Sequence, residues 1–153
     1  MDRSYNILNH LLVDIFNDIL QIEQNALKNN EIGELSITQI HTIEAIGRGK
    51  EKTMSEIAKS LEVTVGTLTI MIDSLIKKGY VERKRKEDDR RVVLVKLTKK
   101  GEAVYLLHEM FHREMIRTII DGLNDEEEKV LINALEKLKE FFRSKYNLTK
   151  GKE

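Results

Sequence analysis

The sequence contains no cysteine and no proline, and each of its eight glycines occurs singly. Without cysteine the chain cannot form a disulfide or sense oxidants through a thiol, and it suits a reducing compartment. Without proline, long helices can run uninterrupted. The first residues lack the pattern of a signal peptide, and no apolar run approaches the length of a membrane span. We therefore expect a cytoplasmic protein with no membrane contact.

Motifs of the common enzyme classes are also missing. The sequence has no glycine-rich phosphate loop, no serine–histidine–aspartate or cysteine–histidine arrangement, and no paired carboxylates in an apolar setting. Its one short glycine motif, at residues 47–49, follows a predicted helix and not a strand, so it does not fit a nucleotide-binding fingerprint. We expect no enzyme activity, no catalytic residues and no cofactor.

Charge is the first feature that points to a partner. Of the 26 cations and 26 acids, residues 77–100 hold 11 cations and only 4 acids, so this segment has a net charge of +7 and the rest of the chain −7. A basic patch on an acidic body is typical of nucleic-acid binding, because cations near phosphates release counterions. A solvated charged face is the alternative.

Apolar spacing and capping residues predict a mainly helical chain of 153 residues, enough for one domain with a core. Residues 4–28 carry apolar side chains at helical spacing, and a loop should follow them. Further helices are predicted to begin at N-capping residues and to end near the following positions: Ser36 with Gln39 to Gly47, Thr53 with Glu56 to Leu61, Thr64 to Gly79, Thr98 to Asp121, and Asn124 with Glu127 to Tyr146.

The middle of the chain predicts a winged helix-turn-helix. Two short helices, at 53–61 and 64–79, surround a three-residue turn. Their buried faces should hold Ile57, Ala58, Leu61, Val63, Leu68, Ile72 and Leu75. Residues 80–86 and 90–97 then alternate as two strands around the polar turn "EDDR". Such a hairpin is a wing, whose cations lie near the DNA backbone. A helical scaffold that binds only protein would not explain this basic hairpin.

The expected fold is therefore mainly α with a small β-hairpin wing. We expect a single domain over residues 1–153, in which 35–98 form the DNA-binding lobe and 4–34 and 99–146 form a helical lobe. The connection at residues 47–53 should be flexible. The outer helices carry more apolar surface than one small lobe can cover, which predicts a homodimer through residues 4–28 and 103–146.

Residues 53–101, with "KKGYVER", "DRR" and "LTKKG" at their observed spacing, resemble the winged-helix core of the MarR family of bacterial transcription regulators. The flanking helices match that family's dimerisation helices, so the resemblance covers nearly the whole chain. Within the family, "LSITQIHTIEAIG", "VTVGTLT" and "LHEMFH" resemble the branch of fatty-acid synthesis repressors. This narrower resemblance implies a repressor of fatty-acid synthesis genes that responds to long-chain acyl groups on acyl carrier protein.

Candidate DNA contacts lie on the second helix of the helix-turn-helix, the recognition helix at 64–79, and on the wing. The face opposite Leu68, Ile72 and Leu75 should show apolar and hydroxyl groups but no Arg, Asn or Gln, which predicts an AT-rich, pseudo-palindromic operator read through thymine methyls and shape. The alternative for Ile70 and Met71 is that their side chains belong to the hydrophobic core and do not contact DNA. The resemblance implies that Asp89 holds Arg91, which enters the minor groove; an exposed salt bridge is the alternative. The DNA-binding candidates are Ser55, Thr64, Thr67, Ile70, Met71, Ser74, Lys77, Arg83, Arg85, Asp89, Arg90 and Arg91.

An effector site is expected between the two lobes. An acyl chain there would be lined by Ile15, Ile19, Ile40, Ile43, Leu107, Phe111 and Met115. The acidic carrier protein would dock near residues 83–86, or at Arg113 and Arg117.

The histidines suggest a different effector. His108 and His112 are four residues apart, so they share a helix face as paired metal ligands do. Zinc-responsive members of the family resemble this pattern, which here would comprise Glu23, His41, His108 and His112. A hydrogen-bonded polar cluster without metal is the interpretation we prefer.

Overall fold

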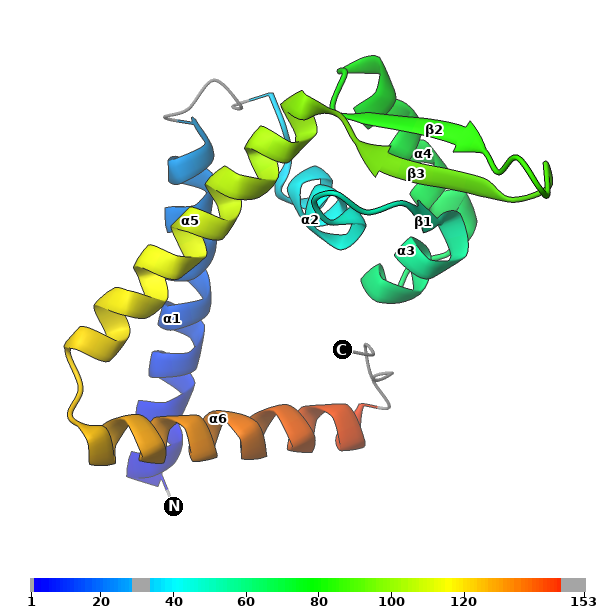
Figure 1. The fold of residues 1–153 in the computed structure, drawn as a ribbon. Helices are drawn as coiled ribbons and strands as arrows, with labels where there is room; N and C mark the ends of the chain where they lie inside the picture. The colour runs from blue at the N-terminus through cyan, green and yellow to red at the C-terminus, as the bar shows by residue number, and fades with distance from the viewer. Residues whose placement is uncertain (1, 29–33, 147–153) are drawn as a thin grey trace. The chain divides into compact units, whose positions relative to one another are not determined.

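The computed structural model describes residues 2–28 and 34–146, and it is mainly helical with one small sheet, as the sequence predicts (Figure 1). The elements are α1 (Asp2–Lys28), α2 (Ile37–Ile46), β1 (Lys52–Thr53), α3 (Met54–Leu61), α4 (Val65–Lys77), β2 (Val81–Arg85), β3 (Val93–Leu97), α5 (Lys99–Asp121) and α6 (Asp125–Lys145). The chain divides into two units, Met1–Ile40 and His41–Glu153, with the boundary inside α2. The loop predicted after α1 falls on residues 29–33, outside the described residues. Over the described ranges, no helix is long and apolar enough to cross a membrane.

The helices begin where the capping residues predict. Each predicted N-cap side chain accepts a hydrogen bond from the first turn of its helix, and Thr53 and Asn124 complete reciprocal capping boxes with Glu56 and Glu127. Ser36 and Gln39 make the same reciprocal pair at the start of α2. At the other end of α4, Gly79 takes a φ of +81°, a left-handed conformation that favours glycine. Local chemistry therefore sets these helix ends.

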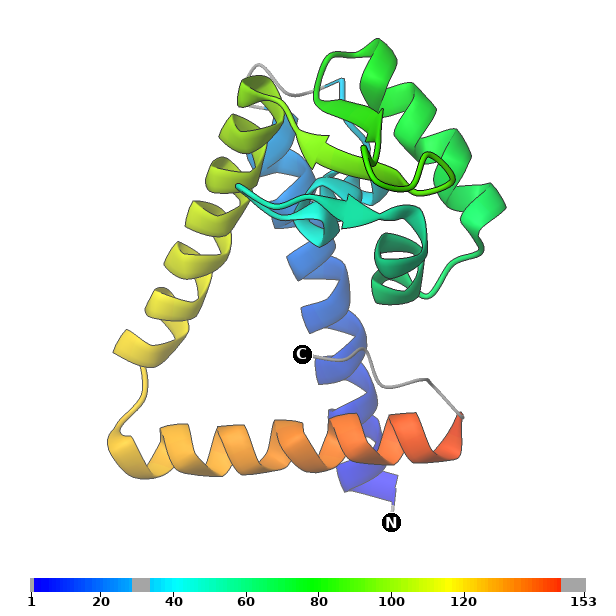
Figure 2. The same cartoon turned by 45° about the vertical axis from the view of Figure 1, so that its right-hand side comes forward.

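The core of the second unit lies between α2, α3, α4 and the sheet. Its fully buried side chains include those of Ile43, Ile46, Ile57, Leu68, Ile72, Leu75, Tyr80 and Val95. The predicted apolar faces of α3 and α4 are thus confirmed, with Ala58 also buried, while Leu61 and Val63 are only half-buried. Each large apolar side chain buried in this way contributes about 1.5–3 kcal/mol. This core holds α4 beside the β2–β3 hairpin, as both views show (Figures 1 and 2).

The sheet has three antiparallel strands in the order β1-β3-β2, where two were predicted. In the predicted hairpin, Val81 pairs with Leu97 and Arg85 with Val93. The additional strand is β1, in which Lys52 pairs with Val95 and Thr53 with Leu94. Two polar residues carry no strand pattern of their own, so only pairing with distant β3 makes them a strand.

The connection before β1, expected to be flexible over residues 47–53, makes hydrogen bonds to α2 and α5, and its last two residues form β1. The Nζ atom of Lys52 donates to the carbonyl oxygen of Ala45 at 2.6 Å, near the end of α2. The backbone N–H of Gly49 donates to Oε1 of Glu102 in α5 at 3.3 Å, and the guanidinium of Arg48 lies 3.9 Å from the same carboxylate. Polar contacts therefore position a segment that lacks apolar residues.

The long outer helices expose large apolar side chains along their length. In α1 these include Leu8, Leu11 and Phe16, and in α6 they include Val130, Leu135 and Phe141. No residue of α6 is buried in the single chain. Exposed apolar surface of this extent marks an interaction face.

Candidate DNA interface

The turn between α3 and α4 places the recognition helix. Glu62 takes a φ of 56°, which is uncommon for a residue other than glycine, and the N–H of Val63 donates to the carbonyl oxygen of Ala58 at 3.0 Å. Thr64 then caps α4 by accepting from the N–H of Thr67. The hydroxyl of Thr64 also donates to the hydroxyl of Thr67 at 3.0 Å. The outward proton of Thr67 is then available to an acceptor on a DNA base.

The exposed face of α4 combines apolar and polar groups. Ile70 is 74% exposed, the largest exposure among the large apolar residues described, so it is not extra core. Thr67 and Lys77 are exposed beside it, and Ser74 is half-buried. An exposed isoleucine on a recognition helix is suited to contact with a thymine methyl.

Met71 is less exposed than Ile70, and its contact with DNA stays a prediction. It is half-buried, and its sulfur accepts a weak hydrogen bond from the hydroxyl of buried Thr42 at 3.7 Å. Its position on α4 is adjacent to that of Ile72 and turns toward α2. This contact favours the alternative, in which Met71 belongs to the packing between α2 and α4.

The tip of the wing is a tight turn closed by backbone hydrogen bonds. The N–H of Val92 donates to the carbonyl oxygen of Asp89 at 3.0 Å, and the N–H of Lys86 donates to the carbonyl oxygen of Val92 at 2.9 Å. The carboxylate of Asp89 accepts from the backbone N–H of Arg91 at 3.1 Å. Asp89 thus holds Arg91 through its main chain, and the entry of Arg91 into a minor groove stays a prediction. The side chain of Arg91 is exposed.

The arginines of β2 lie between this tip and α4. Arg83 donates from Nη1 to Oδ1 of Asp73, in α4, at 2.7 Å. Arg85 donates to the carbonyl oxygen of Arg90 at 3.4 Å. Sequence reasoning missed the pairing of Arg83 with Asp73, whose only sequence signal is a single acid on a helix expected to face DNA. All of the remaining DNA-binding candidates, including Ser55 at the start of α3 and Arg90, have exposed side chains.

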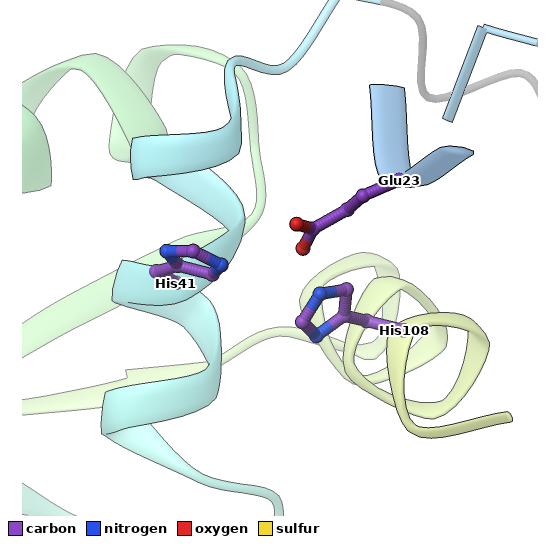
Figure 3. Close-up of side chains that lie close together, drawn as sticks. All are labelled: Glu23, His41 and His108. Atoms are coloured by element: carbon purple, nitrogen blue, oxygen red, sulfur yellow. The ribbon is translucent and has the colours of Figure 1, made fainter. Parts of the chain in front are cut away.

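Three of the histidine-cluster candidates come together in the second unit. His41 and His108 face one another (Figure 3), with their ring centroids 5.7 Å apart. Nε2 of His112 lies 3.2 Å from Nε2 of His108. Oε2 of Glu44, which the sequence reading did not include, lies 3.6 Å from Nδ1 of buried His108. Glu44, His108 and His112 could each offer one ligand atom to a metal ion. Glu23 belongs to the first unit, and its part in a zinc site stays a prediction.

Glu44 is affected electrostatically by these histidines. The pKa of its carboxyl group is lowered from 4.5, first by its close approach to the imidazole of His108 and further by the charges of His112 and His41, while burial opposes the shift. An imidazole next to a carboxylate is found both in metal sites and in polar clusters that hold no metal. Whether the cluster holds a metal ion stays a prediction.

The expected effector-lining residues come from both units. Ile15 and Ile19 are exposed in α1, Ile40 and Ile43 are buried in α2, and Leu107, Phe111 and Met115 are half-buried in α5. The last three are spaced four residues apart, so they share one face of α5. A cavity that combines the two sets stays a prediction.

The comparisons with known proteins agree with this geometry. The sequence model of the MarR family matches residues 35–93. The multiple antibiotic resistance protein MarR of Escherichia coli is 31% identical over 137 residues, which cover 82% of this chain and 95% of that protein. The transcriptional regulator PchR of Bacillus subtilis is 27% identical and covers 88% of this chain and 82% of its own length.

Two solved structures extend the likeness to DNA complexes. Streptococcus pneumoniae FabT in complex with DNA is 42% identical, with a TM-score of 0.86 over 92% of this chain and 98% of that one. A mutant of Escherichia coli MarR with operator DNA is 28% identical, with a TM-score of 0.66 over 90% and 99%. These relatives are regulators and not enzymes. The chain belongs to the MarR family of winged-helix, DNA-binding transcription regulators.

Proposed function

We propose that this protein is a repressor that binds a pseudo-palindromic, AT-rich operator as a homodimer and controls fatty-acid synthesis genes. The observation that carries the DNA part is the exposure of Ile70 on α4, next to a hairpin that carries exposed arginines. A helix face with an isoleucine and hydroxyl groups, but without a bidentate Arg, Asn or Gln, reads thymine methyls and shape better than it reads guanine.

Dimerisation is supported by the exposed apolar side chains of α1 and α6. A second copy of the chain would cover these side chains with the same helices of its own. Such a two-fold arrangement, in which both subunits use the same face, is the commonest symmetry of dimers. A two-fold dimer presents two recognition helices, so the half-sites lie about 10 base pairs apart, one turn of DNA.

The proposed effector is a long-chain acyl group on acyl carrier protein. Support comes from the similarity to FabT and from the apolar face of Leu107, Phe111 and Met115 on α5. An effector that binds one conformation of the protein more tightly than another shifts the affinity for DNA. The size of that shift is limited by the difference in the effector's affinity for the two conformations.

Docking of the acidic carrier would use exposed cations, and most of those on the expected surfaces already pair with acids of this chain. Lys84 lies 2.6 Å from Glu51 and Lys86 lies 3.4 Å from Asp88, while Arg113 and Arg117 pair with acids on their own helix. These exposed pairs are weak and exchangeable. A carrier would therefore compete with them, and its effect should decline with added salt.

A DNA-binding titration tests the effector with long-chain acyl carrier protein, free carrier protein and zinc in parallel arms. The duplex is the one that the protein enriches from a random library. The proposal expects only the acylated carrier to shift the curve. If only zinc shifts it, the histidines are the sensor and the acyl proposal is wrong.

A further inference from the structure

The two faces of β2 carry cations in different electrostatic settings. Side chains alternate along a strand, so Glu82 and Lys84 share one face while Arg83 and Arg85 share the other. On the first face, Glu82 lies 2.9 Å from Lys96, and Lys84 pairs with Glu51. That face is largely neutralised by its own acids.

The second face is the one that packs toward α4. Arg83 pairs across the sheet with buried Val95, and it follows buried Val81 on the same face of β2. Its guanidinium meets Asp73 of α4 at 2.7 Å. The ion pair therefore joins the recognition helix to the strand that leads into the wing.

The position of Asp73 is unfavourable for DNA binding when judged by charge alone. It is the only acid in α4, and it lies three residues after Ile70 and four before Lys77, on the same side of the helix. An anion there repels phosphate. Stability does not compensate for this repulsion, because both side chains are 45% exposed and exposed ion pairs contribute little.

We propose that Asp73 is a positioning residue for DNA binding, which fixes the guanidinium of Arg83 so that its remaining N–H groups donate to one DNA phosphate between the recognition helix and the wing. Arginine has five N–H donors in a rigid fork, so one group can bind Asp73 while others bind phosphate. Phosphate contacts of this kind set the register of a protein on the duplex. Asp73 thus acts on sequence specificity through Arg83.

The sign of the effect separates this role from plain electrostatics. Asp73→Asn removes a negative charge, which by itself strengthens binding to every duplex. If Asp73 positions Arg83, the same change instead weakens binding to the preferred duplex, by about tenfold, and lowers the ratio of specific to non-specific affinity. The slope of log affinity against log salt should also become shallower, by up to about 1 per subunit.

The inference rests on the proposed function, and the experiment separates the two. The wild-type chain first selects a duplex from a random library, and a scrambled duplex of the same composition measures non-specific binding. Affinities are then measured against salt for Asp73→Asn, Arg83→Gln, the double variant, and Glu82→Gln as the matched control. Glu82→Gln makes the same change in charge one residue from Arg83, but on the opposite face of β2.

The expected result is that Asp73→Asn weakens specific binding, that it has no further effect when Arg83 is already Gln, and that Glu82→Gln leaves the ratio unchanged. Asp73→Glu should restore the ratio, because its carboxylate can still reach Arg83, and thermal unfolding should show every variant folded. If Asp73→Asn binds the selected duplex as tightly as wild type or more tightly, the positioning role is overturned. If the wild type selects no duplex, the proposed function fails instead.

Discussion

Gly101, in the first turn of α5, lies so close to the carbonyl oxygen of Tyr80 that a Cβ atom added to the glycine would overlap it. The same carbonyl accepts from the N–H of Thr98 at 3.0 Å, so it cannot move away without breaking that bond. Tyr80 is itself buried at the end of the recognition helix. The start of α5 and the end of α4 are therefore locked together at one backbone contact.

Gly101→Ala should destabilise the fold by at least about 2 kcal/mol, because backbone and not a flexible side chain must shift. Gly66→Ala in α4 is the matched control, since its Cβ would meet only Oγ1 of Thr64 at 3.9 Å. That helical glycine should gain about 0.5–1 kcal/mol as alanine. Urea unfolding of both variants measures this, and equal stabilities would show that the contact is not tight.

Thr53→Ala should cost about 1 kcal/mol, because it removes one half of the capping box with Glu56 at the start of α3. Ser60→Ala, at an exposed position inside the same helix, is the control and should be neutral or slightly stabilising. The same unfolding measurement applies. A neutral Thr53→Ala would mean that β1 pairing alone fixes this helix end.

Such helix ends could be predicted because they depend on residues three apart in the chain. The capping pairs, the apolar faces of α3 and α4, and the alternation that buries Val95 and Leu97 all repeat at the period of their element. The same reasoning located the hairpin, because Val93, Val95 and Leu97 alternate along β3 and a polar turn separates this strand from β2.

The remaining features depend on pairings between distant segments. β1 is a strand only because Val95 and Leu94 lie beside it, and Met71 turns toward Thr42, 29 residues earlier. The Asp73–Arg83 pair forms only because β2 runs beside α4 in the folded chain. Asp89 has its predicted neighbour, and it contacts the backbone of Arg91 because an aspartate in a tight turn easily reaches the N–H two residues on.

The lowered pKa of Glu44 makes a prediction about acid stability. A carboxyl group with a depressed pKa in the folded state adds stability above its unfolded pKa, and this contribution is lost as the pH falls through the folded value. Wild type should therefore lose stability relative to Glu44→Gln as the pH falls from about 5 to about 3. Unfolding free energies at a series of pH values test this. Parallel curves through that window would show that His108 does not hold the carboxylate.

The dimer prediction concerns the exposed apolar face of α6. Leu135→Asn should weaken self-association by roughly 30-fold or more, whereas Glu136→Asn, at the next position, should change it little. Sedimentation at micromolar concentration measures the effect. A wild-type chain that sediments as a monomer would remove the basis for a pseudo-palindromic site.

The measurement that tests the central claim most directly is the affinity of Arg91→Ala and Lys99→Ala for the selected duplex at several salt concentrations. Arg91 lies at the wing tip, and Lys99 lies in the first turn of α5. Because the account places the wing on DNA, Arg91→Ala should weaken specific binding by about 1–3 kcal/mol and Lys99→Ala much less, with wild-type affinity falling steeply as salt rises. Equal effects of the two substitutions, together with a nearly flat salt response, would contradict it.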